Sequence, residues 1–340
     1  MKIRWIYVFD SNDKENALRN KTRDKIKSWW KEFITKKDKI LALLKNKINW
    51  DLPKWIRKNL QSINQNIMWE ISKVEKGWRF IFTPESHREL RPLIKEILRL
   101  SPKIEGWEFN AYRLPEEFSN AIDIIKGRTG GDISDGYFSA KISDINKIDI
   151  DFFSNLDSED QISRAFNDFF TAIEVLCGEE ILDKWIGTIE VSRLDDNHEK
   201  LSHIKILNES VSELIKNING TLPEKPYFQI EEELPWTAYE LKPKEAKDYT
   251  NQLDLIFARS MIPKMWLNAH NESFDSIRFS KNDEIFCYLK TEGNPNSDME
   301  KRSTETGEIE DNLEHFLRKK NIGCIVGAGT GIKYSYIEMQ

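Results

Sequence analysis

Hydrophobic and polar positions in residues 66–114 follow an order that predicts two strands, a helix and a third strand. Alternating runs at 67–71 and 78–82 flank a turn that ends in glycine, which is the pattern of a β-hairpin. A helical stripe of apolar residues lies between this hairpin and the alternating run Trp107–Arg113. The first turn of the helix is expected at Pro84, with a kink or a division into two short helices at Pro92. The range therefore predicts a ββαβ unit.

The same order of elements returns between Tyr137 and Leu194. Runs at 137–142 and 147–153 predict a second hairpin, Ser158 and Gln161 match a capping box before an apolar helix, and residues 187–194 alternate again. The recurrence predicts an α+β fold in which a helix-backed, mainly antiparallel sheet is built from two ββαβ units.

This sheet separates two other predicted regions. Residues 1–65 predict a basic helical region, residues 66–222 the two units in one sheet, and residues 223–340 a smaller C-terminal α+β unit. The N-terminal helices are expected at about 21–47 and after Pro53. The C-terminal unit is predicted to contain a helix at 244–257, strands at 264–269, 277–279, 285–289, 323–326 and 334–338, a polar loop at 291–306 and a short helix at 309–317.

Composition and charge narrow the class of protein. An apolar share of 39% and a charged share of 32% indicate a globular rather than a disordered chain. The net charge is −6, but the first 60 residues hold 17 Lys/Arg against 7 Asp/Glu, a net of +10, which leaves −16 for the remainder. This basic start is interpreted either as a solvated helix face or as a docking surface for an acidic partner or nucleic acid.

Cysteine usage and hydropathy bear on the compartment. Cys177, Cys287 and Cys324 have no spacing typical of a disulfide framework, so free thiols in a reducing compartment are expected. No apolar run approaches a membrane span, and the N-terminal apolar run is too short and interrupted for a signal peptide. We expect a cytoplasmic protein that does not enter a membrane.

The polar side of the predicted sheet is the first candidate binding surface. Alternation turns apolar residues toward the helices and turns another set outward. The predicted outward set is Glu108, Asn110, Tyr112, Asp149, Asp151 and Glu190. A solvated sheet face, which is normal for antiparallel sheets, is the plain alternative.

A glycine-rich stretch near the C-terminus is the second candidate. This stretch could bind an anion through exposed backbone amides and one positive charge. The residues concerned are Gly327, Gly329, Gly331 and Lys333. A dinucleotide fingerprint is excluded because only nine residues follow Gly331, and they alternate like a strand. A tight hairpin loop is the alternative interpretation.

Catalytic and metal-binding signatures are not found in the sequence. The histidines and cysteines lack metal-ligand spacing, and no nucleophile-elbow, Walker or kinase motif occurs. Carboxylate pairs such as Asp149/Asp151 and Glu70/Glu108 suit acid–base work or a divalent cation, but nothing in the sequence singles them out. No catalytic residue, metal or cofactor is predicted, and a non-enzymatic protein is favoured.

Several short blocks resemble uncharacterised bacterial proteins of the domain-of-unknown-function type. The blocks are Met68-Trp69-Glu70, Thr83-Pro84-Glu85, Leu90–Leu93, Gly106–Phe109, Tyr112-Arg113 and the ending Gly327–Glu338. The resemblance implies no enzyme activity, although some similar families act as immunity or accessory proteins beside toxins.

Three functional hypotheses follow. The leading one is a protein-binding, immunity-type or accessory protein that uses the polar sheet face to hold a protein partner. The alternative is a small-ligand or anion-binding protein or hydrolase, with its site between the two α+β units. Nucleic-acid binding by the basic helices within 21–58 is the third, and it predicts affinity that falls with salt.

Overall fold

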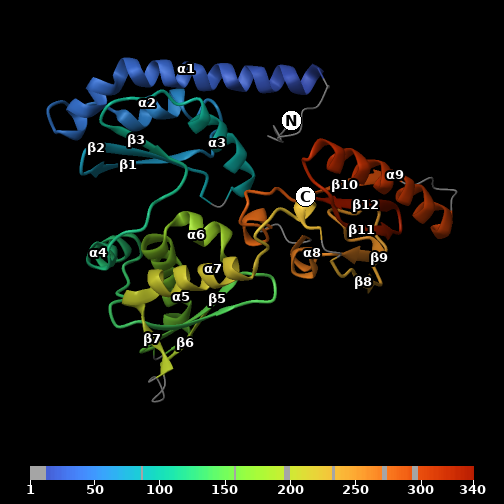
Figure 1. Cartoon of the computed structure of the whole chain (residues 1–340). Helices are drawn as coiled ribbons and strands as arrows, with labels where there is room; N and C mark the ends of the chain where they lie inside the picture. Colours follow the sequence, from blue (N-terminus) through green and yellow to red (C-terminus); the bar gives the residue numbers. More distant parts are fainter. Residues whose placement is uncertain are drawn as a thin grey trace. The chain divides into compact units, whose positions relative to one another are not determined.

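The computed structural model describes residues 13–85, 87–156, 158–194, 200–231, 234–269, 274–292 and 298–340 (Figure 1). Helices combine with antiparallel and mixed sheets, so the predicted α+β fold with a helical N-terminal region is confirmed. The chain divides into two compact units, Met1–Leu114 and Pro115–Gln340.

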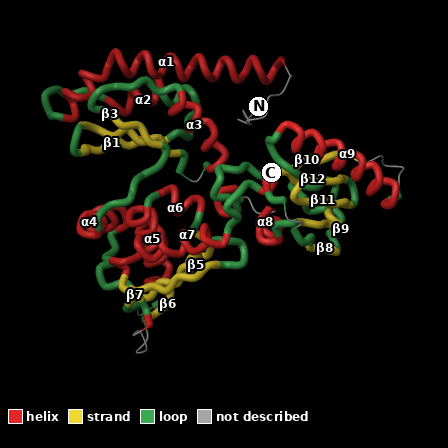
Figure 2. The backbone as a smooth tube through the Cα atoms, in the orientation of Figure 1, coloured by secondary structure: helices red, strands yellow, loops and turns green. Residues whose placement is uncertain are grey.

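A three-stranded sheet and its covering helices make up the first unit. In chain order the elements are α1 (Asp13–Leu44), α2 (Leu52–Asn59), β1 (Met68–Val74), β2 (Gly77–Thr83), η1 (Arg88–Leu90), α3 (Arg91–Arg99) and β3 (Trp107–Asn110). The strand order is β1-β2-β3, with β1–β2 antiparallel and β2–β3 parallel. Figure 2 shows this sheet in yellow beneath the red helix α1.

Aromatic side chains from α1 fill the core of the first unit. Trp30 lies 4.7 Å from Phe109 between ring centres, and Phe33 lies 5.0 Å from Trp107. Their helical spacing places them on one side of α1, where they are buried. The basic N-terminal helices and the first sheet therefore share one hydrophobic core.

Two prolines mark helix starts. The Asp51 side chain accepts a hydrogen bond from the Lys54 amide and caps α2, with Pro53 in the first turn as predicted. The helix start expected at Pro84 is wrong, because η1 begins at Arg88. The division into two short helices expected at Pro92 is confirmed, because η1 ends at Leu90 and α3 begins at Arg91 with that proline in its first turn. The missing proline N–H costs nothing there.

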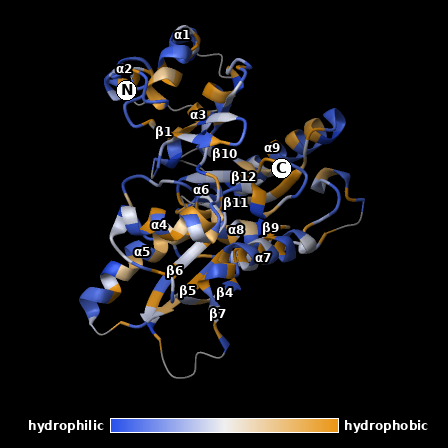
Figure 3. Cartoon of the chain, turned by 90° about the vertical axis from the view of Figure 1, so that its left-hand side faces the viewer, coloured by the Kyte–Doolittle hydropathy of each residue, from blue (hydrophilic) through white to orange (hydrophobic). Residues whose placement is uncertain are grey.

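The first part of the second unit is the second ββαβ set with further helices. Its elements are α4 (Phe118–Thr129), β4 (Tyr137–Ile142), β5 (Ile148–Ser154), α5 (Glu159–Cys177), α6 (Glu179–Lys184), β6 (Ile186–Arg193), β7 (Ser202–His203), η3 (Ile204–Ile206) and α7 (Leu207–Thr221). The strand order is β6-β5-β4-β7, with β5–β6 parallel. The predicted capping box at Ser158 and Gln161 is confirmed. Most helices in Figure 3 carry both hydrophobic and hydrophilic residues, as expected when one side packs on a core.

The two ββαβ sets do not form one sheet, which corrects the prediction. Each set closes on itself, because its last strand runs parallel to the second strand of its own hairpin. Each sheet also has its own hydrophobic core, and β7 occupies the outer edge of β4. The order of elements gave the strands correctly but carried no information on which edges would pair.

The C-terminal part is an antiparallel five-stranded sheet with the order β10-β12-β11-β9-β8. Helix α9 packs against β11 and β12. The elements are η4 (Tyr227–Gln229), β8 (Thr237–Glu240), β9 (Leu255–Ser260), α8 (Pro263–Ala269), η5 (Ser276–Arg278), β10 (Cys287–Glu292), α9 (Met299–Lys320), β11 (Ile325–Gly331) and β12 (Tyr334–Met339).

Several sequence predictions in this part are wrong. The helix expected at 244–257 is absent from these described residues, and its end belongs to β9. The strand expected at 264–269 is helix α8, and residues 299–306 of the expected loop belong to α9.

A buried arginine links the two parts of the second unit. Arg278 is fully buried and donates hydrogen bonds to the Lys184 carbonyl and the Asn268 side-chain oxygen. The Asn146 side chain, in the turn between β4 and β5, donates to the Arg278 carbonyl at 2.9 Å. These contacts join the second ββαβ set to the C-terminal sheet.

Candidate functional site

Residues of the predicted polar face lie on two separate sheets, one in each unit, so they do not belong to the single sheet expected. In the first sheet Glu108 is exposed and accepts hydrogen bonds from the Arg79 guanidinium at 3.0 and 3.1 Å. Asn110 is half-buried beside Ile81. Tyr112 lies beyond the end of β3 and is buried, with the Arg91 guanidinium 4.0 Å from its ring centre. Its predicted outward position is wrong, because the strand alternation ends at Asn110.

The other three residues share the polar face of the second sheet. Asp151 on β5 lies beside Glu190 on the parallel strand β6. Asp149 accepts a hydrogen bond from the Thr188 amide at 2.8 Å, over Gly187, which leaves room for its carboxylate. Glu108 and Asp149 thus each accept hydrogen bonds from a residue of their own sheet. The protein-binding hypothesis stays a prediction.

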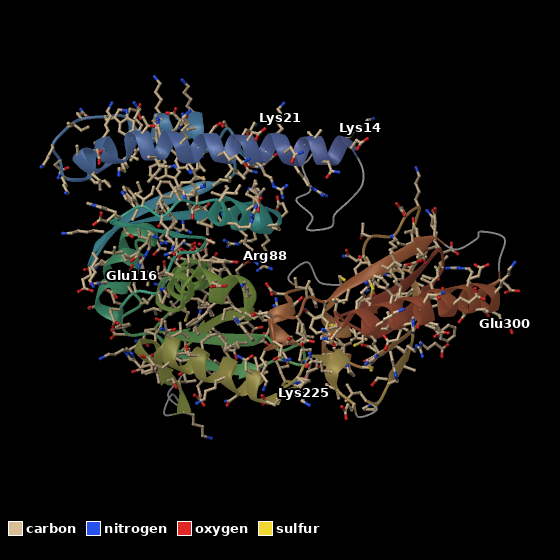
Figure 4. All side chains as sticks on the ribbon, turned by 45° about the horizontal axis from the view of Figure 1, so that its top comes forward. Lys14, Lys21, Arg88, Glu116, Lys225 and Glu300 are labelled. Atoms are coloured by element: carbon tan, nitrogen blue, oxygen red, sulfur yellow. The ribbon has the colours of Figure 1, made fainter. Side chains whose placement is uncertain are left out.

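The basic N-terminal helices keep exposed lysines. Lys21 is exposed on α1, and Figure 4 labels it together with Lys14 on the same helix. Acidic residues such as Asp24 and Asp38 are exposed on the same helix. The nucleic-acid hypothesis therefore also stays a prediction.

The glycine-rich stretch is a strand rather than a loop. Gly327, Gly329 and Gly331 lie in β11, between β12 and β9, and the turn comes after them. Turn amides do bind an anion, but it is the protein's own. The Asp254 carboxylate accepts from the Lys333 and Tyr334 amides at 2.9 Å each.

The glycines clear one face of the sheet for larger side chains. A Cβ atom at Gly331 would lie 2.5 Å from the Asp254 carboxyl carbon. A Cβ atom at Gly329 would lie 2.5 Å from a methyl group of Leu255. At Gly327 it would lie 2.1 Å from Oε2 of Glu338, so the Glu338 carboxyl group rests over this bare backbone.

Glu338 and Gln252 are buried next to each other, and their polar atoms make no hydrogen bond of normal geometry to a described group. Their exposed fractions are 4% and 2%, and no described group makes a hydrogen bond of normal geometry to either carboxyl oxygen or to either polar atom of the amide. Burial raises the pKa of Glu338 to about 7 from its ordinary 4.5, and the neighbouring Gln252 amide offsets part of the rise. Buried polar groups nearly always make hydrogen bonds of normal geometry, so two adjacent buried side chains whose polar atoms make none require an explanation.

Both side chains line a cavity of about 270 Å³. Its remaining wall is mainly apolar and aromatic, with Met265, Phe274, Phe286 and Tyr288. A mostly apolar wall with a few convergent polar groups is typical of small-molecule sites.

A larger hollow of about 820 Å³ lies along α9 and η4. Its arginines pair with carboxylates of the same hollow, since Arg259 contacts Glu310 at 2.6 Å and Arg318 donates to Glu314. Its arginines are thus already paired within the protein, whereas the smaller cavity has buried polar atoms without a hydrogen bond of normal geometry, so the smaller cavity is the stronger candidate site.

Sequence reasoning missed Glu338, although a signal was present. Gly327, Gly329 and Gly331 alternate at the strand period, and Tyr334, Tyr336 and Glu338 do so on the next strand. Two paired strands with that pattern predict side chains from one lying over bare backbone of the other.

Comparison with protein-family models, curated proteins and solved structures found no match to the chain. The resemblance to uncharacterised bacterial proteins thus stays a prediction. Among the helices of the described ranges, none combines the length and apolar character needed to cross a membrane.

Proposed function

We propose that the C-terminal sheet binds a small organic ligand in the cavity beside Glu338. The observation that carries this proposal is the pair of buried side chains, Glu338 and Gln252, at the wall of a mainly apolar cavity, whose polar atoms make no hydrogen bond of normal geometry to any described group. An unpaired buried polar group costs about 1–3 kcal/mol, and perturbed carboxyl groups of this kind gather at functional sites. A bound ligand would supply the missing partners.

The size of the cavity sets the size of the ligand. An apolar cavity of about 150 Å³ is large enough for benzene. The cavity here, at about 270 Å³, has room for one aromatic ring with a short polar side chain. The proposal keeps the small-ligand hypothesis, but places its site within the C-terminal sheet and its helix α8.

Cys287 offers a direct test, because it lines the cavity and is exposed, whereas Cys177 and Cys324 are buried. A thiol reagent should label Cys287 first in the full-length protein. A panel of single-ring compounds with neutral, anionic and cationic groups should contain members that slow this labelling and raise the melting temperature. A ligand at 100 times its Kd adds about 2.7 kcal/mol of stability.

Two variants make the test specific. Ala269→Phe places a ring at the cavity wall and should abolish both effects, whereas Glu240→Gln, at an exposed position on β8, should leave them unchanged. If no compound slows the labelling or raises the melting temperature, or if Ala269→Phe responds like the wild type, the proposal is wrong.

A further inference from the structure

Resting on the proposed function, we infer that the ligand is a small arylalkyl ammonium ion whose positive charge pairs with the Glu338 carboxylate. The cavity combines a buried carboxyl group, a buried carboxamide and aromatic walls. These three features select, in turn, the charge, the hydrogen-bonding head and the body of the ligand.

The positive charge of the ligand is inferred from the positions of the protein's own basic side chains. Arg259, on strand β9 beyond β11, pairs with Glu310 at 2.6 Å. Lys290 Nζ on β10 donates to the Tyr249 carbonyl at 2.8 Å and lies 3.6 Å from the Tyr334 ring centre. Both bases are engaged elsewhere, so a cation that enters the cavity supplies the counter-charge for Glu338. A buried carboxylate is strongly favoured by such a partner.

The hydrogen-bonding capacity fits an ammonium group. An –NH₃⁺ head has three donors and no acceptor. The cavity offers three acceptor oxygens that make no hydrogen bond of normal geometry, namely the two carboxyl oxygens of Glu338 and the amide oxygen of Gln252. The Gln252 amide nitrogen is a donor, and the neighbouring Glu338 carboxyl group is its acceptor. An alcohol has one donor and leaves two of these oxygens unsatisfied.

Aromatic and sulfur-containing side chains fit the body of the ligand. Phe274, Phe286, Tyr288 and Met265 line the cavity around the two polar groups. An aryl ring gains apolar contact there, and aromatic faces also attract a nearby cation. A ring joined to an amine by two carbons would fill a space of about 270 Å³.

Apart from Arg259 and Lys290, the titratable groups described around Glu338 are tyrosines and a cysteine, which stay neutral near pH 7. Burial raises the pKa of Tyr288 on β10 and of Tyr239 on β8 above the ordinary 10.0, and it raises that of the Cys287 thiol above 9.0. On β11 the facing residue is Gly327, and on α8 it is the uncharged Met265. Among these groups, Glu338 alone changes charge between pH 6 and pH 8.

The experiment compares 2-phenylethylamine with 2-phenylethanol, by calorimetry on the full-length protein at pH 6 and pH 8. With a carboxyl pKa of about 7, the ionised fraction rises about tenfold over this range, so the amine should bind about tenfold more tightly at pH 8. The alcohol should bind no more tightly at pH 8. Glu338→Gln should remove the preference for the amine and its pH dependence while retaining alcohol binding, and Glu240→Gln should behave like the wild type.

The outcomes separate this inference from the proposed function. If the alcohol binds as tightly as the amine, or if the affinity of the amine does not change with pH, the cationic ligand class is wrong and the binding site stands. If neither compound binds, and neither slows labelling of Cys287, the cationic inference is overturned. The proposed function falls as well if the wider panel is also inactive.

Discussion

Replacing Glu338 with glutamine should make the protein more stable at high pH. The substitution retains the size of the side chain but removes the ionisable group. In the folded protein burial raises the pKa of Glu338 to about 7, whereas an exposed glutamate has the ordinary 4.5. The folded state therefore holds a proton that the unfolded state releases. The resulting stability is fully present below pH 4.5 and is lost as the pH rises through 7.

The magnitude follows from the difference between these two pKa values. One pKa unit corresponds to about 1.4 kcal/mol, so ionisation of Glu338 should cost the wild type about 3 kcal/mol between pH 5 and pH 9. The Glu338→Gln variant does not lose this stability, because glutamine has no group that ionises in this range. The difference in unfolding free energy between variant and wild type should therefore grow by about 3 kcal/mol over the same range.

Urea unfolding at pH 5, 7 and 9 measures this difference. Hydrogen exchange of peptides from β11 and β12, recorded along the urea series, reports the unfolding of the sheet that contains the substitution. Glu240→Gln is the control, because its side chain is exposed and should give a difference that does not vary with pH. A constant difference for Glu338→Gln would refute the reasoning, since it would mean that the group does not titrate between these values. A gain in stability combined with a loss of amine binding would be the signature of a residue kept for function.

Three further substitutions test the packing. Arg278→Met removes two buried hydrogen bonds and should cost the second unit about 3–5 kcal/mol in urea unfolding; a loss under about 1 kcal/mol would contradict its linking role. Gly329→Ala should lower the melting temperature, with a cost of about 1–3 kcal/mol for the close contact, whereas Gly307→Ala, in open space on α9, should raise it. Phe33→Ala should cost the first unit about 3–5 kcal/mol by denaturant unfolding, and an equal loss for Ile34→Ala, which is 45% exposed, would refute a role of Phe33 in the core.

Local features of the fold were largely readable from the sequence. The apolar spacing of Trp29, Trp30 and Phe33 predicted the buried side of α1, and Ser158 and Gln161 predicted the start of α5. These signals depend on residues within one or two turns of each other. Both ββαβ sets were found for the same reason.

Features that depend on distant contacts were not readable. The pairing of sheet edges is decided between segments far apart in the chain, so the assembly of the two ββαβ sets into one sheet was predicted wrongly. Residues 264–269 form a short apolar run whose periodicity suits either a strand or a helix, and tertiary packing selects helix α8. The glycines of β11 were predicted to form a loop, because the residues that fill the space above them are not their sequence neighbours. These residues lie about 70 positions earlier, at Asp254 and Leu255, or on the next strand, at Glu338.

The Asp254 carboxylate at the β11–β12 turn acts as a tethered ligand. Because it is part of the same chain, its effective concentration at the Lys333 and Tyr334 amides is far above that of any free anion, at millimolar levels or more. A phosphate or nucleotide would have to displace an occupant that cannot diffuse away. The turn is therefore saturated from the moment of folding, and the protein gains a fixed corner of the sheet in place of an exchangeable site.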